Sequence, residues 1–396
     1  MSTALPKGFV IGGMTLGAPL GNGGFGITYL ARDNKTKQKL ALKEYFPAEF
    51  ADRTSDMRVV AKPEWRKLFD MGLDAFLSEA NILKTLPRQP GLVRVRGAFA
   101  KMETAYCVME YIEGDPMDKM IPRVVQQYGS VPEGLIEQFV VSITQALSAV
   151  HSKKLIHRDV KPGNVMIRRD GQPVLIDFGA ARPYGKAAGD ALMFTRKYAA
   201  IEQFPSEGLR LRRRLREGPW SDLYSLSVML YEMVARRVPP DAMTRMEAVQ
   251  QGKKDPYVPV AAMLQRNKTR DKYSDRLLEM IDFGCALLPE NRPANATAYC
   301  RIYTEKLAPQ DASLTQHEQF GMAEKVGTFM RGAATKITSR KPPRDQRTEP
   351  QDAPVSSPQK DTSKRKGVVR MLGLIFLLAV GAAIYGWIGQ PSLEDF

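Results

Sequence analysis

The feature that most constrains this chain is the polar segment HRDVKPGN at residues 157–164. It follows an amphipathic helical pattern over residues 136–151 and precedes the short apolar run Val165 to Ile167. This order of patterns predicts a loop between a helix and a strand. The segment concentrates an acid, two bases and an amide in that one loop.

Three side chains of this loop have complementary chemistry. Asp159 can accept a proton from an attacking hydroxyl, Lys161 can neutralise charge on a phosphate in flight, and Asn164 can hold a metal ion through its carbonyl oxygen. Phosphoryl transfer needs these parts, because it depends on positioning and electrostatics more than on covalent chemistry. A polar surface loop can contain the same residues, so the loop alone does not decide.

A second motif, Asp177-Phe178-Gly179, lies thirteen positions after Asn164 and follows the strand-like residues 173–176. The two motifs together match the kinase catalytic loop and its metal-binding segment. Over residues 9–305 the chain thus resembles a bacterial eukaryotic-like Ser/Thr protein kinase. The resemblance implies a two-lobed α+β fold, with a β-rich N-lobe containing one helix at about 9–110 and a helical C-lobe at about 114–305.

A glycine-rich stretch near the start has G-x-G-x-x-G spacing at Gly21, Gly23 and Gly26. A dinucleotide-binding loop of this spacing opens a helix, but here residues 27–30 have the composition of a strand. A glycine hairpin between strands can fold over phosphates, because its backbone N–H groups reach the oxygens without Cβ hindrance. An ordinary Gly-rich hairpin is the alternative that this stretch alone leaves open.

Lys43 ends the apolar strand pattern of residues 40–44, and Glu79 lies on or near the apolar face of a helical pattern over residues 63–86. By themselves they could be a snorkelling lysine and a solvated glutamate. The resemblance implies instead that Lys43 orients the phosphates of ATP and that Glu79 holds Lys43.

The resemblance also implies the remaining ligands of the nucleotide. The backbone of Glu110 and Ile112 is expected to bond adenine, with Met109 as gatekeeper, and Asn164 and Asp177 are expected to bind Mg²⁺, with Mn²⁺ as the alternative ion. The complete nucleotide-binding set is predicted to be Gly21, Asn22, Gly23, Gly24, Phe25, Gly26, Thr28, Ala41, Lys43, Met109, Glu110, Ile112 and Met166.

The predicted activation segment, residues 180–202, contains one Ser or Thr between Gly179 and Glu202, namely Thr195. By the resemblance, Thr195 bridges the predicted catalytic residues Asp159 and Lys161. Arg158 directly precedes Asp159. In kinases that have an arginine at this position of the catalytic loop, the arginine often binds a phosphorylated activation segment. Either Thr195 both bridges Asp159 and Lys161 and accepts the phosphate, or the activation segment is ordered without phosphate. We favour the second interpretation.

Two further pairings are predicted in the C-lobe. Glu202, at the end of the YAAIEQ motif, is expected to pair with Arg292. Asp222 is expected to brace the backbone of the catalytic loop, although an acid at a helix N-terminus is also favoured by the helix dipole. These features, with Lys161, favour Ser or Thr of proteins as substrates.

The basic charge of the chain, +15 at pH 7, is concentrated in places. Arg196 and Lys197 follow Thr195, which predicts a preference for acidic residues near the phosphoacceptor. Residues 206–219 are dense in arginine. We favour their interpretation as a solvated insertion over their interpretation as a docking site for acidic partners or lipid headgroups. Residues 325–370 are also basic, and neither cluster has the interleaved aromatic residues of a nucleic-acid platform.

The C-terminal part has a different composition. Residues 309–367 are rich in Pro, Ser, Gln and charge and predict a disordered basic linker. Residues 368–389 predict a single transmembrane helix, since 371–389 carry no charge. Basic residues before it place the kinase in the cytoplasm at the inner (plasma) membrane, with a short extracytoplasmic tail at 390–396. A buried core helix is the alternative, and Ala382 and Gly386 have the spacing of a homodimer contact.

The function expected from these observations is a membrane-anchored Ser/Thr protein kinase. It would transfer the ATP γ-phosphate to proteins in bacterial signalling, with autophosphorylation. Three alternatives stay open: a catalytically dead scaffold, a small-molecule phosphotransferase, and a membrane-tethered binding module that uses its arginine clusters.

Overall fold

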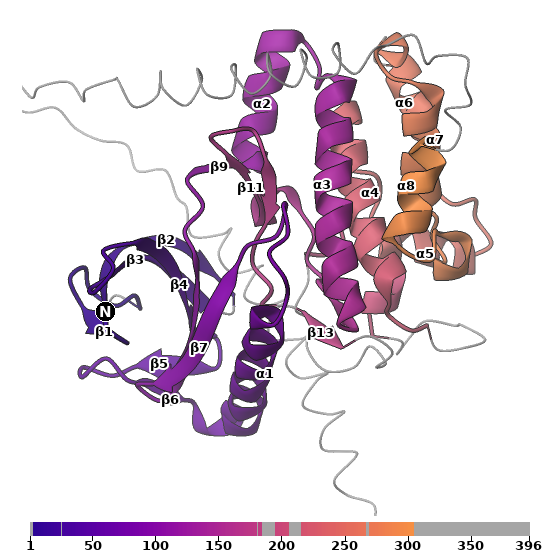
Figure 1. Cartoon of the computed structure of the whole chain (residues 1–396). Coiled ribbons are helices and arrows are strands. Elements are labelled where there is room, and N and C mark those ends of the chain that lie inside the picture. The colour runs from indigo at the N-terminus through magenta and orange to yellow at the C-terminus, as the bar shows by residue number, and fades with distance from the viewer. Residues whose placement is uncertain are drawn as a thin grey trace, which may run out of the picture. The chain divides into compact units, whose positions relative to one another are not determined.

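The computed structural model describes residues 3–24, 26–179, 181–183, 195–205, 215–266 and 269–304. Its N-terminal lobe is a curled antiparallel sheet with the strand order β1-β2-β3-β4-β8-β7 (Figure 1). The strands are β1 (Val10–Ile11), β2 (Met14–Gly23), β3 (Gly26–Asp33), β4 (Lys39–Tyr45), β7 (Val95–Lys101) and β8 (Thr104–Glu110).

The hairpin between β2 and β3 carries the glycine-rich stretch. Gly26 pairs with Tyr45 of β4, and a Cβ on Gly26 would lie 2.0 Å from the carbonyl oxygen of Glu44. That separation is far inside van der Waals contact, so only glycine lets β3 and β4 pair here. The hairpin is thereby fixed close to Lys43, the residue that precedes Glu44 in β4.

One helix, α1 (Arg66–Lys84), packs against β7 and β8 (Figure 1). Its apolar side follows a 3.6-residue period, and the buried Phe69, Ala80 and Leu83 lie on it. Between β4 and α1 the chain forms the hairpin β5 (Ala51–Arg53) and β6 (Val59–Ala61), followed by the 3₁₀ turn η1 (Pro63–Trp65).

The C-terminal lobe is mainly helical. Its small strands form two sheets, β12-β11-β9 and β10-β13. The described elements are β9 (Gly114–Pro116), α2 (Met117–Tyr128), α3 (Glu133–Ser152), β10 (Leu155–Ile156), η2 (Pro162–Asn164), β11 (Val165–Arg168), β12 (Pro173–Leu175), β13 (Arg182–Pro183), η3 (Ile201–Gln203), α4 (Pro219–Ala235), α5 (Ala242–Gln250), α6 (Val260–Arg266), η4 (Arg270–Lys272), α7 (Asp275–Gly284), η5 (Pro289–Asn291) and α8 (Ala296–Thr304).

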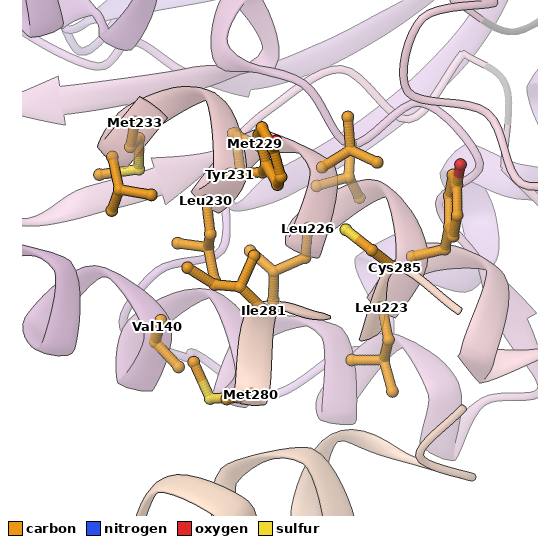
Figure 2. Close-up of a cluster of buried hydrophobic side chains, with 14 of the residues drawn as sticks. Val140, Leu223, Leu226, Met229, Leu230, Tyr231, Met233, Met280, Ile281 and Cys285 are labelled. Atoms are coloured by element: carbon orange, nitrogen blue, oxygen red, sulfur yellow. The ribbon is translucent and has the colours of Figure 1, made fainter. Parts of the chain in front are cut away.

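Helix α4 is the centre of this lobe. It is buried almost all round, as expected of a helix enclosed by other helices, and it packs against α3, α6, α7 and α8. Figure 2 shows Leu226 and Leu230 of α4 close to Ile281 of α7, and each of these side chains is fully buried. The position of α4 is therefore fixed along its whole length.

A buried ion pair closes the start of α4. The Arg292 guanidinium donates to Glu202 Oε1 at 2.7 Å and to the carbonyl oxygens of Ala286 and Leu287. Ser221, in the first turn of α4, donates to the same Glu202 oxygen at 2.8 Å. This is the long-range pair that the sequence predicted, and its hydrogen bonds converge on Glu202 Oε1, while the buried Oε2 has no hydrogen-bond partner among the described residues.

These elements confirm the predicted two-lobed α+β fold. None of the helices described between residues 3 and 304 is long and apolar enough to cross a membrane. The predicted linker (309–367), transmembrane helix (368–389) and tail (390–396) lie outside the described residues.

Asp222 of α4 holds the His157–Asn164 loop from below, as predicted. Its Oδ2 accepts the backbone N–H of His157 and its Oδ1 that of Arg158, both at 2.8 Å. Oδ2 also lies 2.8 Å from Nε2 of His151 on α3. Desolvation alone would raise the pKa of Asp222, but the hydrogen bonds and charges of these neighbours outweigh it and lower the pKa below its ordinary value.

We expect Asp222→Asn to lower the free energy of unfolding by about 1.5–3 kcal/mol at pH 7, because a charge-assisted acceptor is lost. A lowered folded pKa stabilises the fold above the unfolded value of about 3.9, and this contribution is lost as pH falls through the folded pKa. Urea unfolding of parent and variant from pH 7 to pH 3 should show a gap that narrows below about pH 4.

The exposed Asp271 offers a matched control, since Asp271→Asn should leave stability within about 0.5 kcal/mol. A gap between parent and Asp222→Asn that stays the same across the whole pH range would contradict the role of the Asp222 charge.

Candidate active site

The His157–Asn164 loop, which ends in η2, joins β10 to β11, and Arg158 has a left-handed backbone with φ 69°. This conformation is uncommon for a residue with a side chain. It is maintained from several directions: Arg158 N–H donates to Asp222, and Arg158 O accepts from the Gln203 side chain at 2.8 Å. The loop backbone is therefore set before any substrate is considered.

Asp159, Lys161 and Thr195 form a closed hydrogen-bonded triangle. The Thr195 hydroxyl donates to Asp159 Oδ1 at 2.7 Å and accepts from Lys161 Nζ at 2.7 Å. Lys161 Nζ also lies 2.7 Å from Asp159 Oδ2. Thr195 comes from a distant segment of the chain, so the fold brings together three residues that the sequence proposed as partners.

Asn164 completes the surroundings of Asp159. Its Nδ2 donates to the Asp159 backbone oxygen at 2.8 Å and to Asp159 Oδ2 at 2.9 Å. With the Thr195 backbone N–H at 3.1 Å from Oδ1, the Asp159 carboxylate receives four donors. A carboxylate has about four acceptor positions, so this one is fully engaged.

Asp177, like Arg158, has a left-handed backbone, with φ 62°. The neighbouring Phe178 ring lies 4.6 Å from the His157 ring, and His157 Nε2 is 3.2 Å from the carbonyl oxygen of Ile176. These contacts tie the Asp177 segment to the His157–Asn164 loop.

Asn164 and Asp177 are suitable donors for a magnesium ion. The Asn164 amide nitrogen is used on Asp159, which leaves the carbonyl oxygen as its free ligand atom. The described residues contain no group of three or more His, Cys, Asp or Glu side chains that could hold a metal. Mg²⁺ characteristically binds through one or two protein oxygens together with substrate phosphates, so the two residues fit that ion.

Lys43 forms its ion pair with Asp177. Burial would lower the pKa of Lys43, but the Asp177 charge outweighs it and raises the pKa. Desolvation would raise the pKa of Asp177, and the charge and hydrogen bond of Lys43 instead lower it to about 2. The two groups therefore stabilise one another's charged forms.

Glu79 is placed differently from the expectation. It lies half-buried on α1, and within the described part of the chain it makes no hydrogen bond or ion pair with Lys43. Desolvation raises the pKa of Glu79 well above its ordinary value, and the Lys43 charge offsets this only in part. The structure thus pairs Lys43 with Asp177 and leaves Glu79 as a nearby second carboxyl group.

The predicted adenine contacts gather in one apolar cluster. Ala41 of β4 is the register partner of Met109 of β8, and both pack with Ile112 and the partly buried Met166 of β11. The Glu110 backbone N–H donates to Arg94 O at 3.0 Å, so the Glu110 carbonyl is its remaining backbone candidate for adenine.

The predicted phosphate-covering residues lie at the β2–β3 hairpin. Gly21, Asn22 and Gly23 end β2, and Gly26 and Thr28 belong to β3. Gly24 lies in the turn, and Phe25 is outside the described residues.

Sequence reasoning missed the side-chain partner of Arg158. Glu217, which lies just before α4, accepts from Arg158 Nε at 2.8 Å. No motif marks this glutamate, because it follows the arginine-rich stretch at no characteristic spacing. Gln203 was visible within the YAAIEQ motif, but nothing in the sequence indicated that its amide reaches Arg158.

The chain is similar to known proteins in sequence and in fold. The family model "Protein kinase domain" matches residues 14–304. Probable serine/threonine-protein kinase PknB of Bifidobacterium longum is 28% identical over 253 residues, which are 60% of this chain and 32% of that protein. Serine/threonine-protein kinase PknA of Nostoc sp. is 29% identical over 237 residues, which are 57% of this chain and 37% of that protein.

Among solved structures, "PpkA-294 apo form" superimposes with a TM-score of 0.62 at 27% identity, covering 76% of this chain and 100% of that one. The chain spans about a third of the length of the two curated relatives. Because the family model covers most of the chain, the chain belongs to the protein kinase domain family, and its resemblance to bacterial eukaryotic-like Ser/Thr kinases is confirmed.

Proposed function

We propose that this protein is a Ser/Thr protein kinase that transfers the ATP γ-phosphate to hydroxyl groups of proteins. The observation that carries the proposal is the closed triangle of Asp159, Thr195 and Lys161. It places an acceptor for the substrate proton and a cation for the transferring phosphate within one hydrogen-bonded unit. Asp222, which holds the loop backbone, and the buried Glu202–Arg292 ion pair are in place as well.

The saturated carboxylate of Asp159 suggests how substrate enters. An incoming hydroxyl must replace one of the four donors, and the Lys161 ammonium is the mobile one, since it lies at the end of a flexible side chain. Lys161 would then turn toward the transferring phosphate while Asp159 takes the hydroxyl proton. Thr195 would keep Asp159 Oδ1 oriented throughout.

Lys43 can exchange the partner of its ammonium group in a similar way. We propose that Lys43 leaves Asp177 for the ATP phosphates, with Glu79 as its carboxylate partner in that state. The proposal is supported by the Glu79 carboxyl, which lies close enough to influence the Lys43 pKa. Asn164 and Asp177 would hold Mg²⁺, whose charge offsets that of the phosphates.

Full-length protein incubated with labelled ATP, Mg²⁺ and a generic protein substrate should transfer label to Ser and Thr. Asp159→Asn should lower kcat by about 10²–10⁴-fold, because a general base is lost. Exposed Asp271→Asn is the matched control and should retain the parental rate. Absence of transfer by the parent, despite measurable ATP binding, would favour a catalytically dead scaffold.

We further propose that acidic segments are preferred substrates. Arg196 and Lys197 directly follow Thr195, and both side chains are exposed. Arg196 is partly engaged by Asp241, with 3.3 Å between Nε and Oδ1, which leaves Lys197 as the less encumbered charge. These cations lie next to the catalytic triangle, where the residues flanking a phosphoacceptor would run.

On a peptide array, sequences with Asp or Glu near the acceptor should be phosphorylated faster than neutral ones. Lys197→Gln should reduce that preference by about two- to fivefold, consistent with an exposed charge pair worth up to about 1 kcal/mol. The matched control is Lys254→Gln, an exposed lysine of the C-terminal lobe. An array without acidic bias in the parent would refute this substrate class.

Membrane anchoring is proposed on sequence alone. Residues 371–389 carry no charge, and as a helix they would be about 28 Å long, close to the thickness of the hydrocarbon core. Lys364, Arg365, Lys366 and Arg370 precede the stretch, which favours a cytoplasmic kinase domain at the inner membrane. Such a protein would act in bacterial signalling and phosphorylate itself as well as its targets.

Full-length protein should remain in the membrane pellet after an alkaline wash. A double variant with Leu377→Asp and Leu378→Asp should move to the supernatant, since each central carboxylate costs about 2.5–3.5 kcal/mol on insertion. Leu377→Ile with Leu378→Ile is the matched control and should stay in the pellet. Recovery of the full-length protein in the supernatant would disprove anchoring.

A further inference from the structure

Arg158 is buried at 4% exposure, and two nitrogens of its guanidinium lie against the carboxylate of Glu217. Nε lies 2.8 Å from Glu217 Oε2, and the terminal Nη2 lies 3.4 Å from Glu217 Oε1. Glu217 itself is 1% exposed. Two nitrogens on two oxygens is the forked geometry by which an arginine grips a carboxylate or a phosphate.

This grip acts directly on the catalytic loop. Arg158 immediately precedes Asp159. The positive φ of Arg158, 69°, therefore influences how Asp159 is oriented. Its backbone is held by Asp222 and Gln203, while its side chain is held by Glu217. Glu217 is the only one of these three groups that supplies a counter-charge to the Arg158 guanidinium in the contacts described here.

The segment that carries Glu217 is itself anchored. Leu215 is buried at 8% exposure, and the Trp220 indole N–H donates to the Arg216 carbonyl at 3.1 Å. The Gly218 N–H donates to Ser221 Oγ at 3.2 Å, and Ser221 is in turn bonded to Glu202. The carboxylate is therefore held by the same core that contains the Glu202–Arg292 pair.

A second observation, independent of the first, concerns the activation segment. Thr195 is the one Ser or Thr between Gly179 and Glu202. Its hydroxyl is already committed to Asp159 and Lys161. A phosphate on that oxygen would place about two negative charges against the Asp159 carboxylate. The sequence thus offers no separate Ser or Thr acceptor there whose phosphate could serve Arg158.

We propose that Glu217 is a positioning residue that gives Arg158 a permanent internal carboxylate where other kinases present a phosphate. Phosphoryl transfer by this protein then does not wait for phosphorylation of residues 180–201. The inference rests on the proposed kinase function and deepens it, because it identifies what holds the catalytic loop in its working conformation.

The experiment compares full-length parent, Glu217→Gln and Glu217→Asp, with Glu247→Gln as control for an exposed glutamate on α5. Each protein is treated with a phosphatase, freed of it, and assayed at once for kcat and for the KM of ATP. Mass spectrometry measures phosphate in residues 180–201, and thermal unfolding measures the folded fraction.

We expect the parent to transfer phosphate without a lag and without stoichiometric phosphate in residues 180–201. Glu217→Gln should lose about 10–100-fold in kcat, the scale of a small misplacement of catalytic groups, with KM for ATP and folded fraction little changed. Glu217→Asp should recover part of that loss because it restores the charge, and Glu247→Gln should match the parent.

Other results overturn the inference. A parent that gains activity only as phosphate accumulates in residues 180–201 would retain the kinase function and refute the role of Glu217. So would a Glu217→Gln protein with parental kcat, or one whose loss of rate is matched by loss of folded protein. Absence of transfer by the parent and by all variants would refute the proposed function and this inference with it.

Discussion

The rest of the site depends on the buried carboxylate of Asp222. Two successive backbone N–H groups of the catalytic loop end on it, and neither is part of a regular helix or strand at that point. Unpaired buried N–H groups are costly, so these hydrogen bonds decide which loop conformation is stable. The carboxylate is in turn kept charged by its donors, which is why its pKa is lowered despite complete burial. Helix α4 thereby transmits the rigidity of the core to the residue before Asp159.

Around Lys43 the electrostatics are balanced differently. One cation lies among two carboxyl groups, those of Asp177 and Glu79, and can satisfy only one of them by direct contact. Asp177 gains the ammonium, and its pKa falls to about 2, while that of Glu79 rises. An added positive charge beside Asp177 would remove the reason for Lys43 to remain there. The choice of partner by Lys43 therefore depends on the charges around Asp177 and Glu79.

The sequence predicted those parts of the site that are encoded at short spacing. Asp159, Lys161 and Asn164 share one loop. Their function can be inferred from the sequence because few other functions need that combination of side chains. Contacts over long separations were predictable only through resemblance, as for Thr195 with Asp159 or Glu202 with Arg292. The Lys43 pairing was not predictable, because it depends on competition between two carboxylates in a partly desolvated space. The two-lobed fold class was likewise implied by the resemblance that these motifs carry.

Glu217 shows why some functional residues escape such reasoning altogether. A buried carboxylate is stable only with a partner, yet the sequence around residue 217 is dominated by arginines that suggest a solvated surface. Glu217 is internal because it lies two residues after Leu215 and both point into the protein, on a segment fixed by Trp220. Once the segment is inside, Glu217 lies against the guanidinium of Arg158, whose backbone is held by Asp222. Asp222 thus fixes the backbone of Arg158 and Glu217 its charge, and the orientation of Asp159 follows from both.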